Sequence, residues 1–178
     1  MGWDPAAELT EEERKSFRTG GHEGERLWLN VPGPFWTGTT DNCWTGRMEA
    51  PDNVLYAAES AYCAEYVFRQ PKNPAQVRAV AEAAWAEVRG EYGCDGDLHW
   101  TPAEVRSWWA GRGRVAEHLA ESLADFEAND YAVVAEAAAG VRDFQGYLGG
   151  GLAGDLRAYV FRLEEGRYPE AGERLPEL

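Results

Sequence analysis

The sequence predicts a mainly α (α+β) domain: a four-helix bundle or an orthogonal helical array, with a small antiparallel β-sheet or hairpin in its N-terminal half. Two patterns predict it. Between residues 73 and 165, apolar residues recur at spacings of three and four in four successive segments with short connections. Between residues 27 and 72, short runs of β-branched and aromatic residues lie among prolines and glycines, which is typical of strands and turns.

Length and composition indicate one folded unit. The chain has 178 residues, 44% of them hydrophobic, which is enough for one packed core. We therefore expect a single domain over residues 1–178. It divides into an N-terminal helix and loop (1–26), a small β region with a long Trp-rich loop (27–72), a helical core (73–165) and an extended tail (166–178).

The first helix is marked by a capping box. Thr10 is followed three positions later by Glu13, and the two glycines at 20–21 end the segment. Residues 27–31, Leu-Trp-Leu-Asn-Val, alternate enough and are aromatic enough to predict a strand, which the following Pro-Gly-Pro closes.

Two further segments, Val54–Tyr56 and Tyr66–Phe68, have strand composition. They either pair as a hairpin or belong to one helix. Because Pro51 and Pro71 bracket them, and because β-branched and aromatic residues lie at both ends, we favour the hairpin.

The first helix of the second half follows the cap at Asn73–Pro74, and we expect Gly90 to end it. A second capping box, formed by Thr101 and Glu104, starts a long helix. The glycines of segment 111–113 predict a kink or a break in that helix.

The last two helices are separated by three consecutive glycines at 149–151. The third helix begins after Asn129–Asp130, and its apolar stripe covers residues 134–148. The fourth, shorter stripe covers residues 152–163, and the prolines that follow predict an extended tail.

Charge excludes several classes of partner. The 17 Lys and Arg face 31 Asp and Glu, which gives a formal net charge of −14 at pH 7. This surplus repels nucleic acids and anionic membranes, and no apolar run approaches the roughly 20 residues that span a bilayer. A basic protein is the macromolecular partner that such acidity suits; the alternative is that the acids only keep the surface soluble.

The cysteines and the N-terminus indicate the cytoplasm. Cys43, Cys63 and Cys94 are odd in number and far apart, so we expect reduced thiols and neither a disulfide framework nor a zinc knuckle. The N-terminus lacks the basic start and apolar stretch of a secretory signal. Only 2 of the 17 basic residues are Lys, and Ala and Gly abound, so we expect a bacterial source.

The Trp-rich loop over residues 30–53 is the first candidate site, because long loops in compact domains are commonly functional. It combines aromatic anchors, an arginine and many small polar side chains, which suit a protein partner or a small polar ligand. The alternative is that the aromatic residues plug the open end of the bundle while the polar ones satisfy turn backbones. The candidate binding residues are Phe35, Trp36, Thr37, Thr40, Asp41, Asn42, Cys43, Trp44 and Arg47.

The second candidate site is a metal site in segment 94–100. If this segment is extended, Asp95, Asp97 and His99 lie on one side of it, where carboxylates and an imidazole ligate divalent ions. A further ligand would come from elsewhere, for which His22, His118 and Asp41 are available. The alternative is turn chemistry next to a helix N-terminus, where carboxylates are favoured.

These features support two functions. We favour a non-catalytic binding or protein-interaction module, adaptor-like or a neutraliser of a basic partner, which uses the loop over residues 30–53 and needs no cofactor. The alternative is a small metal-assisted hydrolase. Its site would comprise Asp41, Cys43, Asp95, Asp97 and His99.

Overall fold

A computed structural model describes residues 3–18, 26–41, 43–57, 64–129 and 131–178, except for the side chain of Val133. Within these residues the chain forms seven α-helices, two short 3-10 helices and four short strands. The elements are η1 (Pro5–Glu8), α1 (Glu11–Arg14), β1 (Trp36–Thr37), α2 (Gly46–Glu49), β2 (Val54–Tyr56), β3 (Glu65–Val67), α3 (Pro74–Ala86), β4 (Tyr92–Gly93), η2 (Gly96–Leu98), α4 (Pro102–Ala110), α5 (Arg112–Glu127), α6 (Ala132–Gly149) and α7 (Leu152–Glu165).

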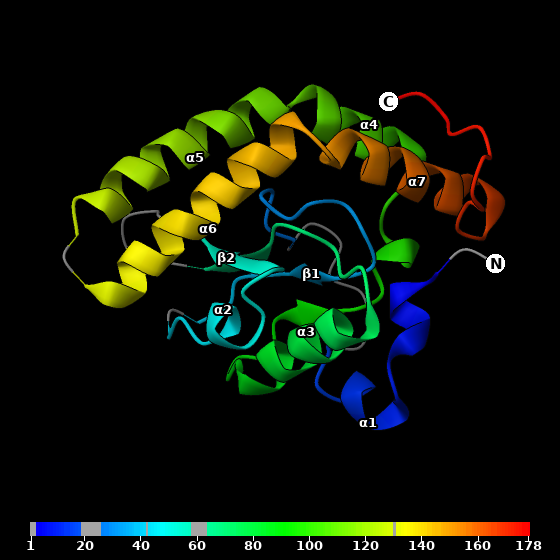
Figure 1. Cartoon of the computed structure of the whole chain (residues 1–178). Coiled ribbons are helices and arrows are strands. Elements are labelled where there is room, and N and C mark those ends of the chain that lie inside the picture. Colours follow the sequence, from blue (N-terminus) through cyan, green and yellow to red (C-terminus); the bar gives the residue numbers. More distant parts are fainter. Residues whose placement is uncertain (1–2, 19–25, 42, 58–63, 130) are drawn as a thin grey trace.

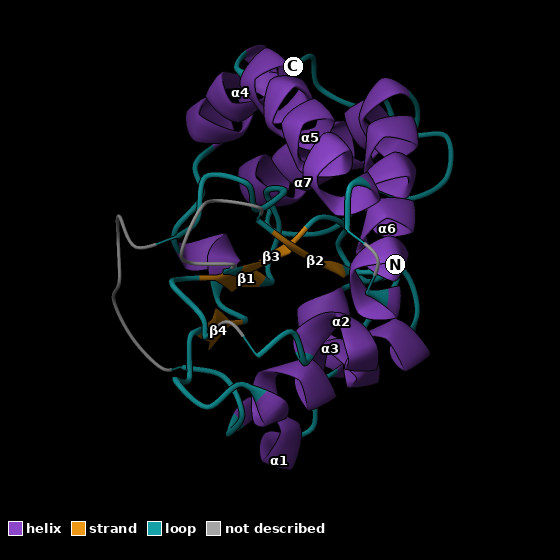
Figure 2. Cartoon of the chain, turned by 90° about the vertical axis from the view of Figure 1, so that its left-hand side faces the viewer, coloured by secondary structure: helices purple, strands orange, loops and turns teal. Residues whose placement is uncertain are grey.

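The helices cover the strands from two sides. Figure 1 shows α4 and α5 as one long arc, with α6 and α7 returning beneath it, so that α6 packs on α5 and α7 packs on α4. The strands lie under this arc, and α1, α2 and α3 lie on their other side (Figure 2). The mainly helical fold class with small antiparallel sheets is therefore confirmed. No helix of the described segments is long and apolar enough to cross a membrane.

Both sheets have two antiparallel strands. β2 pairs with β3 in the register Val54 to Val67, so the predicted hairpin is confirmed, although its connection over residues 58–63 lies outside the described part. β1 pairs with β4, Trp36 opposite Gly93, and lies inside the segment that the sequence indicated as a loop.

The strand predicted over residues 27–31 is wrong. The Asn30 backbone N–H donates to the carbonyl of Leu27 at 3.0 Å, and the Asn30 side-chain amide donates to the same carbonyl at 2.9 Å. This local competition closes a turn in place of a strand, as asparagine side chains commonly do.

The predicted helical boundaries hold at most positions. Both capping boxes form, and the long second helix divides at Gly111 into α4 and α5. Helix α3, however, ends at Ala86 and not at Gly90, because the carboxylate of Glu87 turns back to accept the N–H groups of Arg89 and Glu91.

Two hydrophobic clusters hold the layers together. The larger one lies under the long helical arc and includes Leu55 and Tyr66 of the hairpin, with Leu119 and Phe144 of α5 and α6. In the smaller cluster, the opposite face of the hairpin, with Val54 and Val67, packs against α3. The hairpin is thus buried on both faces, which fits the apolar residues at every position of its strands except Glu65.

Arg47 joins the two halves of the molecule. Its Nε and Nη2 donate to both carboxylate oxygens of Glu136 on α6, at 2.7 and 2.6 Å, and its Nη1 donates to the carbonyls of Pro51 and Val54. Gly140 lets α6 pass this guanidinium, since a Cβ at position 140 would lie 2.5 Å from the Cζ of Arg47. Arg47, predicted as a ligand-binding residue, therefore has its donors engaged within the fold.

A double-mutant cycle tests this joint. We expect Arg47→Ala to lower the free energy of unfolding by about 2–4 kcal/mol, because it leaves two carbonyls and a half-exposed carboxylate without their donor. Gly140→Ala alone should cost about 1–3 kcal/mol through overlap with the guanidinium. In the Arg47→Ala background, Gly140→Ala should cost nothing or should stabilise α6, because alanine has a higher helix propensity than glycine. Urea unfolding of the parent protein, the two single variants and the double variant measures these free energies. Additive effects of the two substitutions would contradict the close packing of Arg47 against position 140.

Candidate functional site: a cavity lined by aromatic rings and prolines

The first half of the predicted binding loop is core. Phe35 is 0% and Trp36 is 1% exposed, and Thr37 and Thr40 are buried as well. Their polar groups serve the fold: the Thr37 hydroxyl donates to the carbonyl of Glu65 at 2.7 Å, and the Thr40 hydroxyl accepts the N–H of Glu65 at 2.6 Å. The two threonines satisfy backbone groups, which is the role that the alternative gave to the polar residues of the loop.

The second half of the loop reaches the surface. Asp41 accepts the N–H groups of Cys43 and Val88, and Cys43 is exposed. The neighbouring Asp41 carboxylate raises the pKa of the Cys43 thiol by hydrogen bonding, so the thiol is kept protonated and is a poor nucleophile. Trp44 has a left-handed backbone, with φ of 61°, and its ring stacks on Tyr56 at 4.3 Å. Asn42 lies outside the described residues.

Segment 94–100 is not extended, because Gly96–Leu98 forms the 3-10 helix η2, so the condition under which Asp95, Asp97 and His99 would share one side is not met. Asp95 accepts the indole N–H of Trp36 at 2.9 Å and lies 3.1 Å from Nε2 of His99.

Asp97 has different partners from Asp95 and His99. It accepts the Tyr159 hydroxyl and pairs with Arg162 of α7. Of the further ligands considered, His118 lies beside Ser122 in the core, and His22 is outside the described residues. In the segments described, no three His, Cys, Asp or Glu side chains are grouped so as to hold a metal ion.

Glu65 forms a buried polar centre that the sequence did not indicate. Its side chain is 0% exposed and accepts the N–H of Gly46 at 2.6 Å and the hydroxyl of Tyr92 at 2.7 Å. Removal from water raises the pKa of Glu65, and the carboxylates of Asp41 and Glu87 raise it further. The group ties α2 to β3 and β4 and faces no solvent, so we assign it to the fold.

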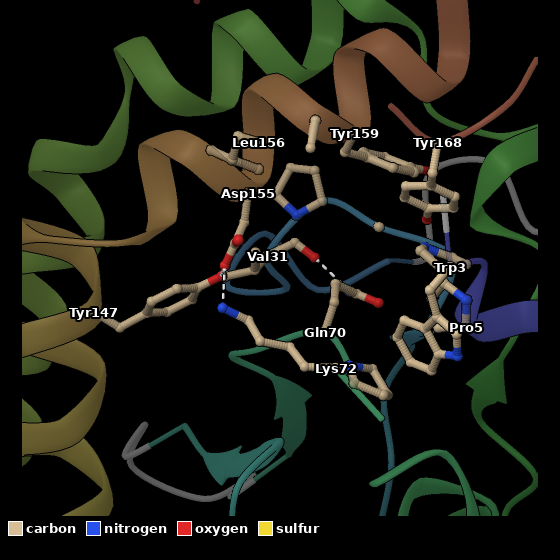
Figure 3. Close-up of a pocket in the computed structure, with 15 residues that line it drawn as sticks. Trp3, Pro5, Val31, Gln70, Lys72, Tyr147, Asp155, Leu156, Tyr159 and Tyr168 are labelled. Atoms are coloured by element: carbon tan, nitrogen blue, oxygen red, sulfur yellow. Dashed lines mark hydrogen bonds and ion pairs between the residues drawn. The ribbon is translucent and has the colours of Figure 1, made fainter. Parts of the chain in front are cut away.

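A cavity of about 240 Å3 lies between α7 and the segments that precede α3. Figure 3 shows its two ends: Tyr147, Lys72 and Asp155 at one, and Trp3, Tyr159 and Tyr168 at the other. The wall contains four aromatic rings and four prolines and few polar groups. Its residues are Trp3, Pro5, Val31, Pro32, Gly33, Pro34, Gln70, Pro71, Lys72, Tyr147, Asp155, Leu156, Ala158, Tyr159 and Tyr168.

Gln70 positions the wall over residues 31–34. Its Nε2 donates to the carbonyls of Val31 and Phe35 at 2.9 and 2.8 Å, and its Oε1 accepts the N–H of Phe35. Gly33 is required beneath this amide, because a Cβ there would lie 2.1 Å from the Gln70 side chain. One side-chain amide thus replaces the ladder hydrogen bonds that a strand would supply.

Most polar side chains of the wall are paired with one another or with their surroundings. The Tyr147 hydroxyl donates to Asp155 at 2.6 Å, and the Lys72 ammonium lies 2.8 Å from the same oxygen of Asp155. The Tyr159 hydroxyl donates to Asp97, and the indole N–H of Trp3 donates to Glu8. The cavity therefore offers ring surface and few open polar groups.

The sequence did not indicate this cavity, because its wall comes from segments far apart in the chain: 3–5, 31–34, 70–72, 147, 155–159 and 168. Only 31–34 belongs to the predicted Trp-rich loop. The one local signal was the density of prolines in segments 32–34 and 71, which we interpreted as strand ends.

The raised pKa of Glu65 predicts a pH dependence of stability. A carboxyl whose folded pKa is raised stabilises the fold below its unfolded pKa, ordinarily near 4.5, and this contribution is lost as the pH rises through the folded value. The free energy of unfolding should therefore fall from pH 5 to pH 8 less steeply in Glu65→Gln than in the parent protein. Urea unfolding at both pH values measures it, with exposed Glu121→Gln as the control of equal charge change. An unchanged slope in Glu65→Gln would contradict the assignment.

Comparison of the chain with protein-family models, with curated proteins and with solved structures gives no match. No relative therefore assigns an activity to the cavity or to the Asp95–His99 pair. The chemistry of the residues themselves is the basis for the function proposed below.

Proposed function

We propose that this protein is a non-catalytic binding module whose ligand enters the cavity between α7 and residues 31–34. The observation that carries the proposal is the composition of the cavity wall, in which aromatic rings and prolines surround about 240 Å3 of space. Ring surfaces supply contact area at low cost in conformational entropy, and they dominate the energetics of binding sites. Of the predicted binding loop, residues 31–34 line this cavity.

The pairing of Asp155, the carboxylate of the wall, and of the Tyr159 hydroxyl supports binding over catalysis. Acid, base and nucleophilic catalysis each need a group that is open to a substrate. At the cavity, Asp155 already accepts the Tyr147 hydroxyl and faces Lys72, and the Tyr159 hydroxyl is engaged by Asp97. These pairs orient and rigidify the walls, which lowers the entropy lost when a ligand binds.

The size of the cavity suits a small apolar group. A dry cavity of about 150 Å3 accepts benzene, so the space here has room for one or two ring-sized groups. A free ligand or a side chain of a protein partner can supply them, and either would displace water from mostly apolar surface.

Indole is a suitable probe of this site, since it is one ring system with a single N–H. In the 15N-labelled protein we expect it to shift the indole N–H signal of Trp3 and the side-chain amide signals of Gln70, with a Kd on the order of 1 mM. Ala158→Leu places a larger side chain in the cavity and should abolish these shifts.

Ala153→Leu is the matched control, because Ala153 lies on the same helix but does not line the cavity. It should leave the shifts unchanged. The proposal is overturned if indole shifts neither Trp3 nor Gln70 up to its solubility limit, or if both variants respond as the parent protein does.

A further inference from the structure

We propose that the occupant of the cavity is a proline-rich segment of a protein partner, bound as a polyproline II helix and flanked by basic residues. This inference rests on the proposed function and names its ligand class. It is carried by the balance of hydrogen-bond donors and acceptors at the wall, by the ring surfaces and by the local charge.

Three of the acceptors at the wall are already engaged. The carbonyl of Val31 accepts from Gln70, the carbonyl of Pro34 accepts the N–H of Gly96 at 2.9 Å, and Oδ2 of Asp155 is shared by Tyr147 and Lys72. An ordinary peptide brings one N–H per residue, and each one buried without an acceptor costs free energy. A proline residue brings no N–H.

Donors, in contrast, remain open at both ends of the cavity. The Lys72 ammonium has three N–H groups, of which the ion pair with Asp155 uses one, and its side chain is 53% exposed. At the other end, the Tyr168 hydroxyl makes no hydrogen bond to the described part of the chain and its residue is only half-buried. A segment rich in carbonyls and poor in N–H groups complements this wall, and polyproline is such a segment.

The ring surfaces agree with this chemistry. Aromatic-lined grooves bind polyproline II segments, whose preformed helix loses little entropy on binding. Tyr147 lies at one end of the cavity and Trp3 and Tyr168 at the other, with Gln70 between them (Figure 3). A polyproline II helix has three residues per turn, so every third proline lies on the same side of the helix, about 9 Å further along its axis. One segment can therefore place proline rings against both the Tyr147 end and the Trp3 end of the cavity.

Charge complementarity selects basic flanks. The cations that contact lining residues are each paired with a carboxylate: Lys72 with Asp155, Arg162 with Asp4 and Asp97, Arg69 with Asp143, and Arg167 with Glu173. With Glu8, which binds the indole of Trp3, the carboxylates of this group outnumber its cations. The whole chain carries a formal net charge of −14. Arg or Lys residues beside the proline run would therefore gain from the field of the protein, and more so at low salt.

The test uses fluorescein-labelled peptides and the full chain, with binding followed by fluorescence anisotropy. The probe is an octaproline of L-prolines with one arginine at each end. Its all-D enantiomer has the same charge and hydrophobicity but the opposite helical hand, and an octaproline with one glutamate at each end has the opposite charge. We expect the arginine-flanked L-peptide to bind with a Kd on the order of 100 µM. The enantiomer and the acidic peptide should each bind at least tenfold more weakly.

Variants then locate the site. Ala158→Leu should weaken binding of the arginine-flanked L-peptide at least tenfold, whereas Ala153→Leu should have no effect. Tyr168→Phe keeps the ring and removes one donor, and it should weaken binding a few-fold. Circular dichroism confirms that each variant is folded, so a loss of binding is separable from a loss of structure.

The outcomes separate this inference from the proposed function. If indole shifts the Trp3 and Gln70 signals but the arginine-flanked L-peptide does not bind, the cavity takes small apolar molecules and the peptide inference is overturned alone. Equal affinity for both enantiomers, or binding unaffected by Ala158→Leu, also overturns it. If neither indole nor the peptide binds, the inference and the proposed function fail together.

Discussion

Buried side chains, and not a long β-ladder, take up much of the backbone hydrogen bonding in the N-terminal half. Its strands are only two or three residues long, yet the segments around them are buried, and buried N–H and C=O groups need partners. Asn30 is the central case. Its Oδ1 accepts the N–H groups of Thr37 and Val67, and its Nδ2 donates to the carbonyls of Leu27 and Thr37. Together with the N–H of Val31 and the hydroxyls of Thr37 and Thr40, Asn30 thereby covers the free edge of β3.

The cavity depends on the same device. The amide of Gln70 fixes residues 31–34 in a shape that no regular element provides, and Gly33 gives it room. Arg47 then holds this half against α6 through Glu136, so that the wall over residues 31–34 faces α7 at a defined separation. A site between two layers is only as rigid as the links between them, and these links are buried, charged or bidentate. The proposed ligand therefore meets a preformed surface.

The helical half was predictable because its signals are local. The capping box at Thr101 and the break at Gly111 are each specified by residues within one or two turns. The turn at residues 27–31 is closed locally by Asn30 bonding to Leu27. The same side chain also accepts the N–H of Val67, 37 positions away, and no periodicity reports that contact. The Trp-rich loop had the composition of a binding site because satisfying buried backbone groups and binding a polar ligand use the same residue types. The cavity, built from distant segments, left no pattern in any one of them.

Hydrogen exchange of single amides tests the central claim most directly. The N–H groups of Phe35, Thr37 and Val67 are bonded to side-chain oxygens of Gln70 and Asn30. If these side chains hold the N-terminal half, the three amides exchange only on global unfolding, with protection equal to that of Phe144 in the core of α6. Exchange at the rate of the exposed amide of Glu11, the first residue of α1, would contradict the account, because the segment would then open independently of the fold.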